Sequence, residues 1–296
     1  MNIQKIKQCI KYYTRNYMPS NLYTKLYITY QKIFGDKNHA ENNKKFAKFT
    51  KKGIYDFKLD GTEFKIFLDP NCGCVDYEIF ASKCFEPGIL NLFKKELKLT
   101  DTFLDIGANI GQHSMYAAHF CNKVISFEPI KRLYEQFNDS IFVNDILNIQ
   151  TFNYALGNKK EELEIYSNEV NMGASSILVS ENRKVEQIIK VLRLDDSYNE
   201  MCIDKIDFVK IDVEGYELNV LIGMEKLVQK YKPKILVEFT PYFYNKVDVS
   251  ISKNLYDFLI ENKYEIWDVG NMGEQYIKIE SFNQIKDLDQ TNLFCR

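Results

Sequence analysis

The chain has 296 residues, a formal net charge of −2 and 45% hydrophobic residues, which is the composition of an ordinary globular protein. It contains no run of about 18 apolar residues, and its N-terminus lacks the apolar core of a secretory signal, so we expect a cytoplasmic protein without a membrane-spanning helix. Its seven cysteines form no disulfide framework, and the single-residue spacing of Cys72 and Cys74 argues against a zinc site.

The first 55 residues are strongly basic. They hold twelve basic and two acidic residues, a formal charge of +10, which leaves −12 for the rest of the chain. Apolar residues at helical spacing predict two helices, over 3–17 and 22–34, within an N-terminal extension that covers 1–50. Three roles stay open for it: packing on the body or on a second subunit of a homo-oligomer, contact with an anionic surface such as the inner membrane face, and binding an acidic acceptor. The acidic body disfavours nucleic acid.

Residues 51–296 are expected to form the main domain. In its lead-in, 51–100, alternating apolar residues around Asp60-Gly61 predict a β-hairpin, and a helix is expected over 76–97 with an interruption near Pro87-Gly88. From 101 to 296 strands alternate with helices, which is typical of a parallel sheet in an α/β fold. Strands are predicted at 103–106, 123–128, 149–154, 206–211, 234–239, 264–270 and 291–296.

A long insertion, 156–205, follows the third of these strands. It contains two strand-like segments, around Leu163 to Ile165 and over 188–194, with a Gly-Ser segment between them. Insertions of this length at the edge of a sheet often shape a substrate pocket, and we expect the same here.

The segment FLDIGANIG, residues 103–111, predicts a buried strand, a glycine-containing loop and a helix that begins near Gln112. Gly107 and Gly111 permit a sharp turn and a close approach of a ligand, and the N-terminus of the following helix suits an anionic group. Glu128 lies 23 residues after Asp105, close to the spacing of an acid that binds ribose hydroxyls. These residues predict a site for an adenosine-containing ligand.

The dinucleotide fingerprint is incomplete in this loop. Asn109 stands where its second glycine would be, and Ser114 follows in a segment, 112–114, that contains no third glycine. They favour an amino-acid head group over a pyrophosphate, and so argue against an NAD-dependent oxidoreductase. A catalytically silent binding module is a further alternative, which the acids Glu128, Asp212 and Glu238 disfavour.

Six blocks of sequence, FLDIGANIGQHS, VISFEP, NYALGN, GASS, IDFVKIDVEGYE and ILVEF, closely resemble the FkbM family of S-adenosylmethionine-dependent methyltransferases over about residues 76–296. The resemblance implies a Rossmann-like methyltransferase fold with a seven-stranded, mostly parallel sheet, and S-adenosylmethionine as cofactor. Cofactor contacts are then expected at Asp105, Gly107, Asn109, Gly111, Ser114, Glu128, Ala155 and Asp212. The family implies O-methylation of a sugar or glycan precursor in surface polysaccharide synthesis, with a natural product or a lipid head group as the alternative acceptor.

Acidic residues stand at the ends of two later strands. The related fold is expected to place both strands beside the first one, with Asp212 facing the methyl group as general base or acceptor-positioning carboxylate. Binding the methionine amine or capping a helix that starts at Glu214 are the alternative roles of Asp212. Glu238 is the second catalytic candidate, with structural hydrogen bonding as its alternative role.

Relatives often carry a histidine shortly after the glutamate that corresponds to Glu238, where this chain has Phe239-Thr240. His113, beside the glycine loop, is therefore the third catalytic candidate. A divalent metal ion on Asp212 and Glu238 is not expected, because the sequence lacks the paired aspartates of such sites.

Overall fold

The computed structural model describes residues 51–69, 74–167 and 184–296. The basic extension with its two predicted helices and the GASS block at 173–176 lie outside the described residues, so the roles considered for the extension stay predictions. Within the described part, no helix is both long and apolar enough to cross a membrane.

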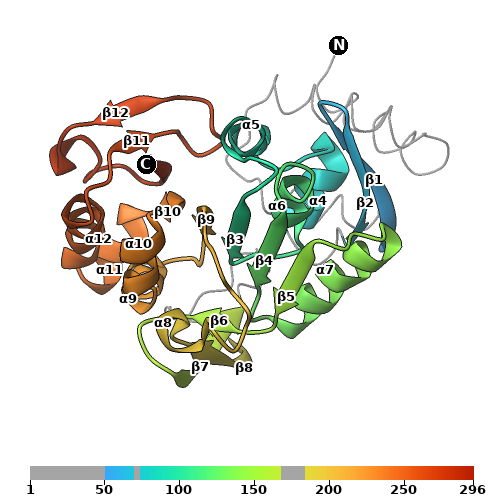
Figure 1. Ribbon diagram of the computed structural model, residues 1–296, viewed down its shortest axis with the longest axis horizontal. Coiled ribbons are helices and arrows are strands. Elements are labelled where there is room, and N and C mark those ends of the chain that lie inside the picture. Colours follow the sequence, from blue (N-terminus) through green and yellow to red (C-terminus); the bar gives the residue numbers. More distant parts are fainter. Residues whose placement is uncertain (1–50, 70–73, 168–183) are drawn as a thin grey trace, which may run out of the picture.

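An eight-stranded sheet with the order β12-β11-β13-β10-β9-β3-β4-β5 forms the centre of the protein (Figure 1). Its strands are β3 (Thr102–Ile106), β4 (Lys123–Phe127), β5 (Ile149–Phe152), β9 (Phe208–Ile211), β10 (Lys234–Phe239), β11 (Ile266–Asp268), β12 (Ile277–Ile279) and β13 (Thr291–Cys295). β10, β9, β3, β4 and β5 pair in parallel, whereas β13 pairs antiparallel with β10 and β11. This topology confirms the predicted Rossmann-like α/β class.

The sheet differs from the prediction in two respects. It has eight strands instead of seven, because β12 adds an antiparallel edge strand; two of its three residues are exposed, so no apolar pattern marks it. The neighbours of β3 are β4 and β9, so β10 does not flank the first strand as expected but lies one strand further out.

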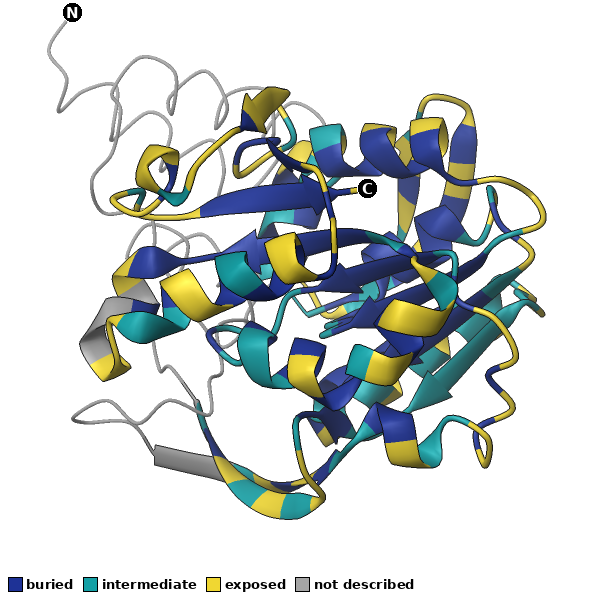
Figure 2. Ribbon diagram, turned by 60° about the vertical axis from the view of Figure 1, so that its left-hand side comes forward, coloured by how far each residue is buried: buried dark blue, intermediate teal, exposed yellow. Residues whose placement is uncertain are grey.

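Helices cover both faces of the sheet (Figures 1 and 2). They are α4 (Cys74–Ser82), α5 (Pro87–Glu96), α6 (Gln112–Ala117), α7 (Lys131–Val143), α8 (Leu194–Ser197), α9 (Glu217–Gly223), α10 (Glu225–Tyr231), α11 (Pro241–Val247) and α12 (Ser250–Glu261). Alternate residues of β3 enter two different cores: Phe103 packs with α5 to α7, and Leu104 packs with α9 to α12. A strand that is buried on both faces needs a continuous apolar run, which explains why these strands were recognisable in the sequence.

The lead-in forms the predicted hairpin, β1 (Gly53–Leu59) and β2 (Thr62–Leu68), around the left-handed residues Asp60 and Gly61. β2 packs on α7, where Ser140 Oγ accepts a hydrogen bond of 2.9 Å from the Phe67 amide. The predicted interruption of the following helix is confirmed, because α4 and α5 are separate helices.

The insertion after β5 forms a small separate sheet of β6 (Ala155–Leu156), β7 (Glu161–Ser167) and β8 (Lys184–Leu192). After it, the chain returns to the central sheet on the other side of β3, as β9. The strand order therefore reverses between β3 and β9, and such a switch point opens a crevice at the carboxyl ends of the strands.

Candidate active site

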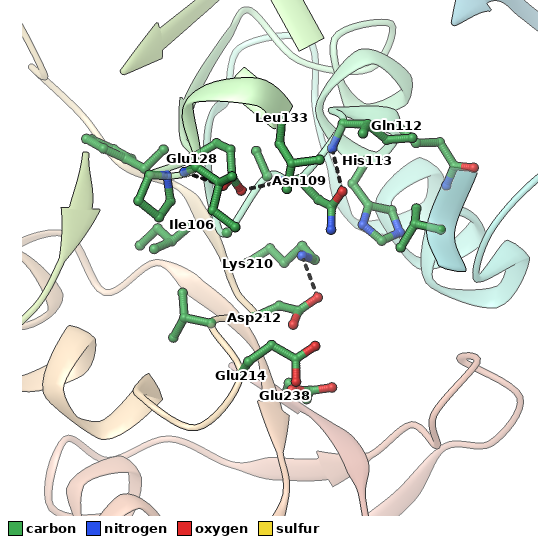
Figure 3. Close-up of a pocket in the computed structure, with 18 of the residues that line it drawn as sticks. Ile106, Asn109, Gln112, His113, Glu128, Leu133, Lys210, Asp212, Glu214 and Glu238 are labelled. Carbon is green, nitrogen blue, oxygen red and sulfur yellow. Dashed lines mark hydrogen bonds and ion pairs between the residues drawn. The ribbon is translucent and has the colours of Figure 1, made fainter. Parts of the chain in front are cut away.

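A cavity of about 580 Å³ lies at this switch point (Figure 3). Its walls come from the loops after β3, β4 and β9, from β10, from α4 and the α4–α5 loop, from the insertion, and from residues 271, 272 and 290. Its volume is within the range of small-molecule and cofactor sites. Six acidic residues line it, namely Glu78, Glu86, Glu128, Asp212, Glu214 and Glu238.

The glycine loop has three left-handed residues at alternate positions, Gly107 (φ 84°), Asn109 (φ 53°) and Gly111 (φ 81°). Asn109 tolerates this conformation because its side-chain oxygen accepts a local hydrogen bond, here of 2.9 Å from the Ile110 amide. The predicted sharp turn is confirmed.

The reason for glycine in this loop is nevertheless different from the one expected. A Cβ at Gly107 would overlap the carbonyl oxygen of Asp212, and one at Gly111 would overlap the ring of Phe137. The space that the two glycines leave is thus filled by protein and not kept open for a ligand. The loop amides are also occupied: residues 107 and 108 donate to Phe127, residue 109 to Glu128, and residue 111 to Ala108.

Glu128 follows β4 and is buried at one end of the cavity. Its Oε2 accepts from the Asn109 amide and its Oε1 from the Ile130 amide, each at 2.8 Å. Burial raises the pKa of this carboxyl to about 7, against the lowering effect of the two amides. Since each carboxylate oxygen can accept more than one hydrogen bond, both can still accept from hydroxyls in the cavity.

Asp105, Gly111 and Ser114 lie behind the cavity wall instead of lining it. Ser114 Oγ donates to Asp105 Oδ2 at 2.6 Å, and Lys210 Nζ lies 3.6 Å from Asp105 Oδ1. Burial raises the pKa of Asp105, and the Lys210 ammonium lowers it. These residues shape the wall, and a direct contact between them and a cofactor stays a prediction. Of the other predicted contacts, Gly107, Asn109, Glu128, Ala155 and Asp212 do line the cavity.

Asp212 directly follows β9 and is held by Lys210, whose ammonium donates to Asp212 Oδ2 at 3.0 Å. The alternative role of Asp212 as a helix cap is wrong, because α9 begins at Glu217 and not at Glu214. Glu217 instead satisfies the intervening loop: its Oε1 accepts from the amides of Val213 (3.1 Å) and Gly215 (3.0 Å).

Glu238, in β10, lines the cavity close to Asp212 and Glu214 (Figure 3). One of its carboxylate oxygens accepts a hydrogen bond from the side-chain amide nitrogen of Gln290. Burial, followed by repulsion from Asp212 and Glu214, raises its pKa well above the ordinary value. No group of three or more His, Cys, Asp or Glu side chains within the described part is arranged to hold a metal ion.

His113 lies in the first turn of α6 and is buried, with its ring edge against Phe93. Its Nε2 has no hydrogen-bond partner among the described residues and lies 3.4 Å from Glu86 Oε2. Burial, and then the charge of Lys210, lowers the pKa of His113 well below the ordinary value, so the imidazole is neutral at pH 7. Its neighbour Glu86 has a pKa raised to about 8, first by burial and then by Asp212.

Two of these residues were not predicted from the sequence. Lys210 had a usable signal, since it stands two positions before Asp212 in a strand and must share its face. Glu86 had none, because only the packing of the α4–α5 loop on α6 brings it to the cavity.

Comparison with known proteins places these residues in a family. The sequence model of the family described as the methyltransferase FkbM domain matches residues 105–266, which include the glycine loop, Glu128, Asp212 and Glu238. The chain is 27% identical over 150 residues to the hexuronic acid methyltransferase AglP of Haloferax volcanii, which is 49% of this chain and 58% of AglP. It is 22% identical to Methyltransferase 1 of Beauveria bassiana, over 55% of this chain and 73% of that protein.

Solved structures resemble it more distantly. The methyltransferase FkbM from Methylobacillus flagellatus KT has 17% identity and a TM-score of 0.45, over 68% of this chain and 44% of that one. The matched part thus spans less than two thirds of both AglP and this structure. The family match covers more than half of the chain and holds the predicted cofactor and catalytic residues, and the protein belongs to the FkbM family of methyltransferases.

Proposed function

We propose that the protein is an S-adenosylmethionine-dependent O-methyltransferase that acts on a hydroxyl group of a sugar or glycan precursor. The observation that carries the proposal is a single cavity at the β3–β9 switch point with Glu128 at one end and Asp212 near its centre (Figure 3). The acid proposed to bind the ribose and the proposed base thus follow two strands of one sheet.

The residues present fit the cofactor. Glu128 keeps acceptor capacity for two ribose hydroxyls. Beside it, an apolar wall suits an adenine ring, formed by Leu133, Tyr154, Ala155, Leu156, Ile165 and Ile189. Three of these residues come from the insertion, which would make its described part a cofactor wall. S-adenosylmethionine carries two positive charges and one negative charge, and an acid-rich cavity favours such a ligand.

The catalytic proposal assigns separate roles to Asp212 and Lys210. When bound, S-adenosylmethionine supplies a methyl group activated by a sulfonium sulfur. Asp212 would align the acceptor hydroxyl and accept its proton as the new O–C bond forms and the S–C bond to the methyl group breaks, which would leave the thioether S-adenosylhomocysteine. Lys210 would hold the Asp212 carboxylate in a fixed orientation through their hydrogen bond. Asn271 and Gln290, on the wall beside Glu238, offer amide groups to a polyhydroxy acceptor.

An acceptor screen with methyl-labelled cofactor tests the proposal. We expect label in a sugar acceptor, among neutral sugars, hexuronic acids and nucleotide sugars, and we expect it to be stable to mild base, as an ether is. The hexuronic acid activity named for AglP supports including acidic sugars. Label found only in lipid head groups or natural products would support the alternative acceptor class, and label in none of these would contradict the proposal.

A further inference from the structure

Glu86 is held at the cavity by contacts on both sides of its loop. On one side, the Gln112 side chain brackets the Phe85 backbone: Phe85 N donates to Oε1 at 2.7 Å, and Nε2 donates to the Phe85 carbonyl at 2.9 Å. On the other side, Gly88 packs so tightly on the backbone of Met272 and Gly273 that a Cβ would overlap it.

Glu86 itself has a left-handed backbone, with φ 49°, directly before Pro87. A residue other than glycine adopts this conformation at a cost, and such conformations persist where the surrounding structure enforces them. The Glu86 carboxylate is therefore fixed by the fold, in contrast to a surface glutamate that only happens to reach the cavity.

The corner formed by Glu86 and His113 has unused acceptors. His113 Nε2 is buried without a hydrogen-bond partner and lies 3.4 Å from the Glu86 carboxylate. The charged groups that act on Glu86 are Asp212, Glu78 and Lys210. Among the described residues that line the cavity, Lys210 is the only lysine or arginine, and it already contacts Asp105 and Asp212.

The geometry places this corner where the amino-acid part of the cofactor would lie. Glu128 and His113 are at opposite ends of the cavity, with Asn109 between them (Figure 3). With the ribose at Glu128, the methionine part extends towards His113. The amides of 107, 108, 109 and 111 are already paired within the protein, and an ammonium group needs acceptors, which the side chains of Glu86 and His113 can offer.

We propose that Glu86, together with His113 Nε2, binds the α-ammonium group of the cofactor's methionine part. The assignment rests on the proposed function. The ammonium donates to the Glu86 carboxylate and, in the neutral imidazole tautomer that carries its proton on Nδ1, to His113 Nε2, so that both groups act as acceptors at once. A pKa of about 8 for Glu86 agrees with a carboxyl group whose cationic partner arrives with the ligand.

Calorimetric titration with two ligands tests the assignment. S-adenosylhomocysteine has the amino-acid part, whereas 5′-methylthioadenosine shares the adenosine and thioether but lacks it. We expect Glu86→Gln to weaken the binding of S-adenosylhomocysteine by about tenfold to a hundredfold, which is the range of a charge-assisted hydrogen bond. The same variant should change the binding of methylthioadenosine by less than about twofold. Glu128→Gln should weaken the binding of both ligands, because both carry the ribose.

Glu200→Gln is the matched control, since it makes the same substitution at an exposed position outside the cavity and should leave both affinities unchanged. His113→Phe keeps the aromatic packing but removes the hydrogen-bond acceptor Nε2, and it should weaken the binding of S-adenosylhomocysteine but not that of methylthioadenosine. If Glu86→Gln does not fold, this variant decides the question by the same comparison.

The possible failures are distinguishable. Equal losses for both ligands, or no loss for either, in Glu86→Gln would overturn the ammonium site while leaving the proposed function intact. Wild-type protein that binds neither ligand would contradict the proposed function and the ammonium site together.

Discussion

Lys210 lies in β9 and Asp212 directly follows this strand, and the buried ammonium of Lys210 lies 3.0 Å from Asp212 and 3.6 Å from Asp105. Asp105 is fully buried, whereas Asp212 reaches the cavity. The two carboxylates therefore differ in access: both pair with the lysine, but of the two only Asp212 lines the cavity, where we propose that it meets the acceptor.

The first prediction concerns Asp212. Asp212→Asn should lower kcat by about 10²- to 10⁴-fold, the usual contribution of general acid–base catalysis, with S-adenosylhomocysteine affinity within a few-fold of wild type. Asp204→Asn, at an exposed position, is the control. Steady-state kinetics and calorimetry on both variants check it, and an unchanged kcat in Asp212→Asn would remove Asp212 from the proton transfer.

Lys210→Met should destabilise the protein by about 3–5 kcal/mol, because it leaves Asp105 as a buried charge without its cation. The double variant Lys210→Met with Asp105→Asn removes both charges and should recover much of the loss. Urea denaturation measures both. A single variant as stable as wild type, or a double variant no better than the single one, would show that Asp105 does not depend on Lys210.

The pKa of Glu86 gives a pH prediction. Its carboxyl is raised to about 8, so it is mostly protonated at pH 6 and must ionise to bind an ammonium group. Affinity for S-adenosylhomocysteine should therefore rise as the pH increases from 6 to 8. Glu128, with a pKa of about 7, adds to the lower part of this rise. In Glu86→Gln the part between pH 7 and 8 should vanish, and calorimetry that finds the wild-type pH dependence unaltered would contradict the assignment.

At the scale of elements, the glycine loop depends on its packing against α7. Gly111→Ala should lower the free energy of unfolding by about 2–4 kcal/mol, because alanine would be strained in the left-handed conformation of this position and its Cβ would overlap Phe137. Gly61→Ala is a matched control: its φ is 85°, but nothing lies within 4 Å of the added Cβ, so only the strain remains. Denaturation curves compare the two, and equal losses would mean that the Phe137 contact contributes nothing.

The elements were predictable where a local pattern determines them. Buried strands such as β3 and β9 are continuous apolar runs, and the hairpin turn is marked by Asp60-Gly61. β12 was missed because its exposure leaves no pattern. The start of α9 was placed too early because the Glu217 side chain, and not a helical turn, satisfies the amides of residues 213 and 215.

At the scale of the whole molecule, the sheet explains how distant residues form one site. Three parts of the site, namely the glycine loop, Glu128 and Asp212, each follow a parallel strand. Because the carboxyl ends of parallel strands meet at one edge of a sheet, the sequence predicts that these parts lie close together. The position of β10 depends on strand order, which no local pattern encodes. Glu86 lies outside this rule as well, because its placement comes from Gln112 and the Gly88–Gly273 contact.

Calorimetric titration of the wild-type protein with S-adenosylhomocysteine and, separately, with NAD tests the central claim, which is that the switch-point cavity binds an adenosylated amino acid. Asn109 replaces the second glycine of the dinucleotide fingerprint, no third glycine follows at 112–114, and Glu128 lines the cavity. We predict saturable binding of S-adenosylhomocysteine that Glu128→Gln weakens, and no binding of NAD. Binding of NAD without binding of S-adenosylhomocysteine would contradict the account.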